Sequence, residues 1–310
     1  MVPGKTLKLA AGAALAFFLV AGCAVKKTER LPVLALQTAT LEDLRGRLER
    51  QADAVHTINA EAELVPATGS AYSGVIEQYH DVKAFVLAEQ QPGTGGNSLP
   101  AQAGRHIRVL GQAPIVRKTI FDMVADEREF RILLPTKNKF VVGPTELERR
   151  SEKPIENLRP QHLFEALFPS APATGPRAQA FLEENEFSGR RYYAVTEIVE
   201  AEGAWRPARR WWFDRTDLAL VRVQSFDAEG RLLADIHYGQ WQETDGIPYP
   251  RTIELVRPQE DYRLKLIVKK LTLNQPLPPE RFRLEPPAGV ETVELKSASA
   301  DKPDSGKEPR

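Results

Sequence analysis

Residues 219–241 read ALVRVQSFDAEGRLLADIHYGQW. Apolar and polar side chains alternate on both sides of Asp227-Ala228-Glu229-Gly230, a run of residue types that favours a turn. Alternation with a period of two is typical of strands that bury one face, and a short turn between two such runs predicts an antiparallel hairpin.

The same alternation continues on both sides of this hairpin. Strands are predicted in the C-terminal half at residues 189–200, 205–214, 219–226, 232–241, 249–256 and 262–273. In the last of these the apolar phase shifts across Lys269 and Lys270, which predicts a β-bulge. Earlier strands are predicted at residues 73–89, as one long strand or two, and at residues 105–111, 115–125, 129–135 and 139–143.

Two helical patterns interrupt the strands. Thr40 precedes an apolar stripe with helical spacing over residues 41–55, and Asp43 stands three residues on, where a capping box needs it. From Ile58 the period changes to two, so a helix is expected to run directly into a strand. A second, shorter helix is predicted over residues 159–169, which are mostly apolar and bracketed by prolines. The expected fold is mainly β with some α, in which an antiparallel sheet curves into an incomplete barrel.

Composition argues against several classes of protein. The 310 residues carry 42 Lys+Arg and 42 Asp+Glu, and this balance argues against a nucleic-acid partner. The single cysteine cannot form a disulfide within the chain, and with five histidines it makes a poor basis for a zinc site. No nucleophile elbow, phosphate loop or His-Glu-x-x-His motif is present. We therefore expect a protein that is not an enzyme and has no metal or dissociable cofactor.

The N-terminus resembles a bacterial lipoprotein signal. Lys5 and Lys8 precede an apolar run over residues 9–22, which is too short to span a bilayer and suits a signal peptide. The run ends in Leu19-Val20-Ala21-Gly22-Cys23, which resembles a lipobox. This predicts cleavage between Gly22 and Cys23 and a diacylglyceryl thioether on the Cys23 thiol. The alternative is a secretory signal that is cleaved without lipidation.

These signals divide the chain into four predicted parts. Residues 1–22 form the signal peptide, 23–39 the lipidated N-terminus and tether, 40–295 the folded domain and 296–310 a disordered tail. Ala24 follows the lipidated cysteine, where an aspartate would be the usual signal for retention in the inner membrane. We therefore expect attachment through the lipid to the outer membrane, facing the periplasm.

Two further features allow more than one interpretation. The four tryptophans lie in or beside predicted strands and are interleaved with arginines, so they could form a cation–π platform or a belt at a membrane surface. The alternative is a purely structural role, in which one tryptophan of each neighbouring pair lies inside the curved sheet and one outside it. Residues 90–104 are long for a loop between strands, so they are either functional or a surface insertion.

The order of these elements resembles the LolA/LolB family of lipoprotein carriers in the bacterial envelope. The resemblance covers residues 40–295 and includes the opening helix that runs into a strand. It further rests on local patterns: IRV at residues 107–109, FRILLP at 130–135, KFVVG at 139–143, the short helix at 160–168, GIPYP at 246–250 and FRLEPPAG at 282–289.

The resemblance implies an antiparallel half-barrel lidded by short helices, with an apolar cavity for the acyl chains of lipoproteins or other envelope lipids. The lid would comprise part of residues 41–55 together with Leu163, Phe164, Leu167 and Phe168. The cavity floor would include Phe121, Phe130, Ile132, Leu266 and Val268. Leu99 would correspond to the exposed leucine with which a LolB-like receptor delivers lipoproteins to the membrane. A periplasmic carrier protein is a further expected partner, and the alternative is a structural or interaction lipoprotein that docks to an envelope complex, its half-barrel filled by its own side chains.

Overall fold

The computed structural model describes residues 35–69, 77–78, 81–90, 104–145 and 159–295. The predicted cleavage site, Cys23, Leu99 and the predicted tail lie outside these residues. Within them the strands form one 15-stranded sheet. The strands are β1 (Thr57–Thr68), β2 (Glu77–Gln78), β3 (Val82–Glu89), β4 (His106–Gln112), β5 (Thr119–Ala125), β6 (Glu129–Leu134), β7 (Lys139–Pro144), β8 (Ala178–Phe187), β9 (Arg190–Ala201), β10 (Ala204–Asp214), β11 (Leu220–Phe226), β12 (Leu232–Thr244), β13 (Ile247–Arg257), β14 (Tyr262–Leu273) and β15 (Glu291–Glu294).

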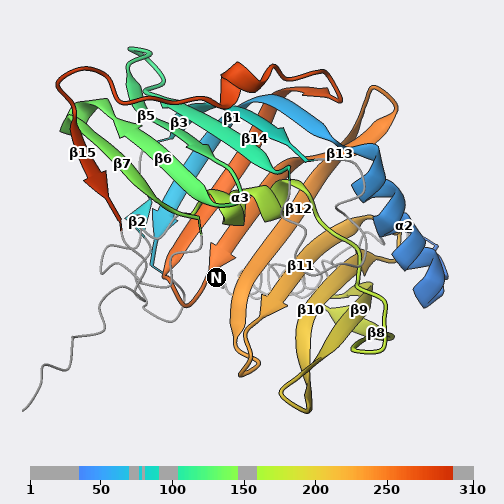
Figure 1. The fold of residues 1–310 in the computed structure, drawn as a ribbon. Helices are drawn as coiled ribbons and strands as arrows, with labels where there is room; N and C mark the ends of the chain where they lie inside the picture. The colour runs from blue at the N-terminus through green and yellow to red at the C-terminus, as the bar shows by residue number, and fades with distance from the viewer. Residues whose placement is uncertain (1–34, 70–76, 79–80, 91–103, 146–158, 296–310) are drawn as a thin grey trace, which may run out of the picture. The chain divides into compact units, whose positions relative to one another are not determined.

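The sheet is open and curled. Its order is β15-β7-β6-β5-β4-β3-β1-β14-β13-β12-β11-β10-β9-β8, with β2 paired to β1. The neighbouring strands pair antiparallel, apart from β15, which runs parallel to β7. The order has two ends, and the sheet curls around a concave face instead of closing (Figure 1). This confirms the predicted mainly β, half-barrel architecture with short helices.

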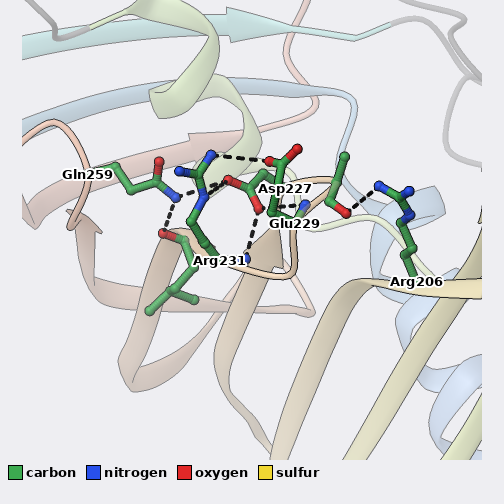
Figure 2. A network of polar contacts seen from close by, with 7 residues as sticks. Arg206, Asp227, Glu229, Arg231 and Gln259 are labelled. Carbon is green, nitrogen blue, oxygen red and sulfur yellow. Dashed lines mark hydrogen bonds and ion pairs between the residues drawn. The ribbon is translucent and has the colours of Figure 1, made fainter.

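Hydrogen bonds fix the turn of the hairpin β11–β12. The Asp227 carboxylate accepts hydrogen bonds from the backbone N–H groups of Glu229 and Arg231 and from the Arg231 guanidinium (Figure 2). Gln259, in the turn between β13 and β14, donates to the same carboxylate at 3.3 Å, and Arg206 of β10 donates to the Ala228 carbonyl at 2.6 Å. The turn is therefore tied to both neighbouring hairpins.

The β-bulge predicted at Lys269 and Lys270 is present. The register between β1 and β14 shifts from Glu61 opposite Lys270 to Ala62 opposite Val268, which leaves Lys269 as the extra residue. The bulge lets two consecutive lysines reach β1: Lys270 pairs with Glu61 at 3.2 Å and Lys269 with Glu63 at 2.9 Å. This long-range β1–β14 pairing joins the N-terminal and C-terminal halves of the sheet.

Other strands differ in part from expectation. The strand predicted at residues 115–125 begins only at Thr119, because residues 113–118 form a tight turn with Arg117 in the left-handed region. The described part of residues 73–89, predicted as one long strand or two, contains the two strands β2 and β3. The strands β8 and β15 were not predicted, because β8 carries Glu183, Glu184 and Glu186 at an edge of the sheet and β15 has a single apolar side chain.

The first described helix, α2 (Leu41–Ala54), begins at the predicted capping box. Thr40 accepts a hydrogen bond from the Asp43 N–H, and the Asp43 carboxylate accepts one from the Thr40 N–H. At its end, Asn274 donates to the Ala54 carbonyl at 2.7 Å and Gln90 donates to the Val55 carbonyl at 2.8 Å. The buried stripe of α2 packs near β13 and β8.

The second helix, α3 (Pro160–Leu167), lies within the curl of the sheet (Figure 1). Both helices and the concave face share the main apolar cluster, which runs through β1, β3–β6 and β9–β14. A smaller cluster of Val124, Phe140 and Leu284 lies on the other face. The short helix η1 (Pro135–Lys137) contacts β5, and the short helix η3 (Pro279–Phe282) contacts β4. The core is therefore concentrated between α3 and the concave face.

Candidate functional site: the concave face and its lid helix

Helix α3 buries most of its surface in the concave face. Leu163, Phe164 and Leu167 are each at most 4% exposed, and Phe168 follows directly after them at 9%. The rings of Phe164 and Phe168 stack with their centres 4.7 Å apart. Pro160 occupies the first helical position, where its missing N–H leaves no hydrogen bond unmade. The helix is thus a short apolar plug in the curl of the sheet.

The structure brings all the predicted lid and floor residues into one apolar cluster with α3. Of the floor residues, Phe130, Leu266 and Val268 are buried, while Phe121 and Ile132 are half-buried at the edge of the cluster. The ring of Phe121 lies over Gly111 on the neighbouring strand β4, where any β-carbon would clash with it at 2.3 Å. Part of residues 41–55 was also predicted to belong to the lid, and Leu44 and Leu48 from this range join the same cluster.

Two tyrosine hydroxyls hold α3 from the sheet. The Tyr262 hydroxyl on β14 lies 2.6 Å from His162 Nδ1 in the first turn of the helix. The Tyr249 hydroxyl on β13 donates at 2.9 Å to the carbonyl oxygen of Leu167, the last residue of α3. Carbonyls in the last turn of a helix have no partner within the helix, so the Tyr249 bond satisfies an acceptor that would otherwise be buried unpaired. Neither tyrosine could be predicted from the sequence, because the partner of a hydroxyl depends on tertiary packing.

The segment after α3 crosses the sheet as a strap, which we define as residues 169–173. Trp211, fully buried on β10, donates its indole N–H at 2.9 Å to the Ser170 carbonyl, and Arg209 donates at 2.5 Å to the Ser170 hydroxyl. Further along, the Glu197 carboxylate accepts a hydrogen bond from the Ala173 N–H at 2.6 Å. Three side chains from β9 and β10 therefore fix the strap.

Burial sets the protonation of the groups around α3. Desolvation, together with the charges of Arg257 and Arg159, lowers the pKa of His162 to about 3, so this imidazole is neutral at physiological pH. Desolvation also raises the pKa of Glu197, although the Ala173 N–H opposes the shift. Burial raises the pKa of Tyr262 well above its ordinary value, so its hydroxyl stays protonated.

A small cleft opens beside the first turn of α3. It is lined by residues of β4, β5 and α3, among them Arg105, Gln161 and Phe164. Its volume is about 30 Å³, which is room for about one water molecule. An acyl chain does not fit there while α3 occupies the concave face.

Sequence reasoning missed an exposed apolar tip at the hairpin between β4 and β5. Ile115 is 93% exposed and Val116 is 73% exposed, and the basic residues Arg117 and Lys118 follow them directly. The turn is closed by hydrogen bonds between residues 113 and 118. Pro114 before two β-branched residues was the sequence signal for this turn, but the alternation of apolar and polar side chains placed these residues in a strand. Leu99, predicted for the membrane-delivery role, lies outside the described residues.

The two tryptophans on β10 lie on opposite faces of the sheet, as expected if one of each neighbouring pair lies inside the curved sheet and one outside. Trp211 is fully buried on the concave face, whereas Trp212 is half-buried on the other face. There the guanidinium groups of Arg210 and Arg222 lie 6.0 and 5.7 Å from its ring centre. The arginines thus cover the outer tryptophan and do not leave it free as a platform.

Neither a metal site nor a spanning helix is found in the part of the chain that the structure describes. Its His, Cys, Asp and Glu side chains form no group of three that could hold a metal ion. Its helices are all too short or too polar to cross a bilayer.

Comparisons with known proteins found likeness mainly among solved structures. A family model described only as an uncharacterized protein matches residues 177–285, and no curated protein matches the chain. A domain from Vibrio parahaemolyticus described as an outer membrane lipoprotein-sorting protein is 12% identical over 77% of this chain and 94% of its own, with a TM-score of 0.49. A LolA superfamily protein from Nitrosomonas europaea is 13% identical over 80% of this chain and 99% of its own, with a TM-score of 0.45. A DUF1329 family protein from Desulfovibrio piger is 14% identical over 78% of this chain and 95% of its own, with a TM-score of 0.50. At this level of identity the likeness concerns the fold alone, and the chain shares the fold of the DUF1329 family protein.

Proposed function

We propose that the protein binds acyl chains of lipoproteins or other envelope lipids on the concave face of its sheet, and that it serves lipid or lipoprotein sorting at the outer membrane. The observation that carries this proposal is α3: a short helix with an almost wholly apolar buried face, seated in a concave apolar sheet and hydrogen-bonded to it through His162 and the Leu167 carbonyl.

Displacement of α3 would expose a surface suited to hydrocarbon. The side chains of Leu163, Phe164, Leu167 and Phe168 together hold about as much hydrocarbon as one acyl chain. A ligand that takes their place restores the apolar contacts that the sheet loses, so opening and binding nearly offset each other. An open state without hydrocarbon, in contrast, would leave the apolar face in water, which disfavours that state.

The exposed tip and the N-terminal signal support a place at a membrane. Ile115 and Val116 project two large apolar side chains into solvent beside Arg117 and Lys118, a combination that suits an anionic bilayer surface. Lipidation of Cys23 would hold the domain near that surface. We assign to this tip the membrane-delivery role that the sequence had suggested for Leu99.

A second candidate function is that of a structural or interaction lipoprotein. It is favoured by the filled interior, because α3 already occupies the concave face and the adjoining cleft holds only about 30 Å³. In this case α3 is ordinary core, and a surface of the protein docks to an envelope complex.

Native mass spectrometry of the full chain, purified from a bacterial envelope with Cys23→Ser, tests the two functions. The proposal expects a bound acylated molecule that Val268→Glu removes, because a carboxylate on the floor of the concave face cannot be buried against hydrocarbon. The matched control is Phe187→Glu on β8, where the ring is 69% exposed and the change should leave the bound molecule in place. Circular dichroism confirms that both variants fold. Bare wild-type protein, under conditions that preserve a known lipid–protein complex, would favour the second candidate.

A further inference from the structure

Three tyrosines lie on the adjacent strands β12, β13 and β14 in the apolar cluster beneath α3. Tyr238, Tyr249 and Tyr262 are each at most 5% exposed. The hydroxyls of Tyr249 and Tyr262 bind α3 at its two ends. The Tyr238 hydroxyl is fully buried and has no hydrogen-bond partner among the described residues.

Two polar side chains near Tyr238 bond to other groups and not to its hydroxyl. Trp241, whose ring centre lies 6.3 Å from that of Tyr238, donates its indole N–H to the Leu220 carbonyl. The Glu165 carboxylate on α3 accepts a hydrogen bond from Gln161. Burial, and then the negative charge of Glu165, raise the pKa of Tyr238 far above its ordinary value, so the phenol keeps its proton and remains a donor.

A buried hydroxyl without a partner weakens the closed protein, because it has lost its bonds to water and gained none. A phenylalanine would fill the same space without that loss. The position therefore favours a phenol only if another state of the protein gives its hydroxyl an acceptor.

We infer that the Tyr238 hydroxyl is the polar subsite of the acyl-binding face and donates a hydrogen bond to the ester carbonyl oxygen of a bound acyl chain. This inference rests on the proposed function. An ester carbonyl is an uncharged acceptor attached to hydrocarbon, so it can enter a buried apolar site at small cost. A free fatty-acid carboxylate would have to be desolvated close to the Glu165 carboxylate, which disfavours it.

Two lysophospholipids that differ only at this carbonyl provide the test. The probes are 1-palmitoyl-lysophosphatidylcholine, which has an ester, and 1-O-hexadecyl-lysophosphatidylcholine, which has an ether in its place. Each is titrated below its critical micelle concentration into the full chain with Cys23→Ser, and binding is followed by tryptophan fluorescence and native mass spectrometry. The wild-type site should bind the ester about tenfold more tightly than the ether, the ratio expected for one buried hydrogen bond of about 1.4 kcal/mol.

Tyr238→Phe should abolish the preference for the ester while leaving ether binding unchanged, and it should not lower the melting temperature. The matched control, Tyr249→Phe, weakens the closed lid and should strengthen binding of both probes equally, with the preference intact. Equal binding of both probes by the wild type, or a preference that survives Tyr238→Phe, would overturn the subsite and leave the acyl-binding function standing. Binding of neither probe would overturn both.

Discussion

Replacement of Tyr249 by phenylalanine separates a lid from an ordinary core helix. The change removes one hydroxyl and leaves the shape of the ring in place. In the closed state it deletes the 2.9 Å hydrogen bond to the Leu167 carbonyl, which is then buried without a donor. In an open state both groups would be solvated, so the closed state alone is weakened.

The size of the effect follows from that one bond. A buried acceptor left without its donor costs about 1–3 kcal/mol. With a middle value of about 2 kcal/mol, the equilibrium between open and closed lid shifts roughly 25-fold toward the open form. Affinity for acyl ligands should rise by the same factor, as long as the open form remains a minor population.

Native-state hydrogen exchange measures this opening directly. The reporter is the Phe168 N–H, which bonds to the Phe164 carbonyl at 3.0 Å and is released when α3 unfolds or undocks. We expect it to exchange through a local opening of lower free energy than the amides of β9 and β13, and to exchange about 25-fold faster in Tyr249→Phe. The control is Tyr192→Phe on β9, whose ring packs edge-on against Trp212 on the other face of the sheet, and which should leave the Phe168 amide unchanged.

One result would refute the reasoning. If the Phe168 amide of the wild type exchanges only with the same free energy as the strands of the sheet, α3 opens only when the whole domain unfolds. The helix is then part of the core, and the scaffold interpretation is correct.

Three further predictions test neighbouring features. The pKa of His162 is lowered to about 3 in the closed state and returns toward 6.5 when the ring is exposed to water. The equilibrium constant for lid opening should therefore increase up to tenfold per pH unit as the pH falls from about 6.5 toward 3. Hydrogen exchange of the α3 amides at several pH values measures this constant, and His162→Gln should remove its pH dependence. Replacing Ile115 and Val116 by serine should weaken co-sedimentation with anionic phosphatidylglycerol vesicles about 10- to 100-fold without lowering the melting temperature, and unchanged binding would exclude the tip as a membrane contact. Trp211→Phe removes a buried indole and its bond to Ser170, and should cost about 2–4 kcal/mol in urea unfolding; a loss below about 0.5 kcal/mol would contradict the assigned packing of the strap.

Local signals account for what the sequence could predict of the fold. The turn at Asp227, the capping box at Thr40 and the bulge at Lys269 each depend on a few neighbouring residues, and all three are present. The pairing of β1 with β14 joins residues about two hundred positions apart, and alternation carries no information about which strands become neighbours. The edge strand β8 was missed because only part of one face is buried, so charged residues break its pattern.

In the candidate site, too, local features were predictable and long-range partners were not. The apolar residues of α3 were predictable, because a short helix that is apolar on most of its surface must be covered. The partners of its polar atoms were not, since Tyr249 and Tyr262 lie more than eighty residues further along the chain than the atoms they bind. The tip at Ile115 was missed because a β-branched pair favours a strand unless tertiary structure reveals the tight turn.

The distribution of polar contacts around α3 determines how the lid would open. At its first turn His162 is hydrogen-bonded to Tyr262, and the Arg159 guanidinium at the N-cap lies over the Phe130 ring. At its other end the Leu167 carbonyl is held by Tyr249, and the strap beyond is held by Trp211, Arg209 and Glu197.

Opening at the first turn therefore breaks the hydrogen bond between His162 and Tyr262 and the contact between Arg159 and the Phe130 ring. Once it is exposed below about pH 6.5, the neutral His162 ring gains a proton, which favours this opening. The same opening uncovers the face on which Tyr238 lies. The unpartnered Tyr238 hydroxyl therefore becomes accessible in the state in which an acyl ligand could reach it.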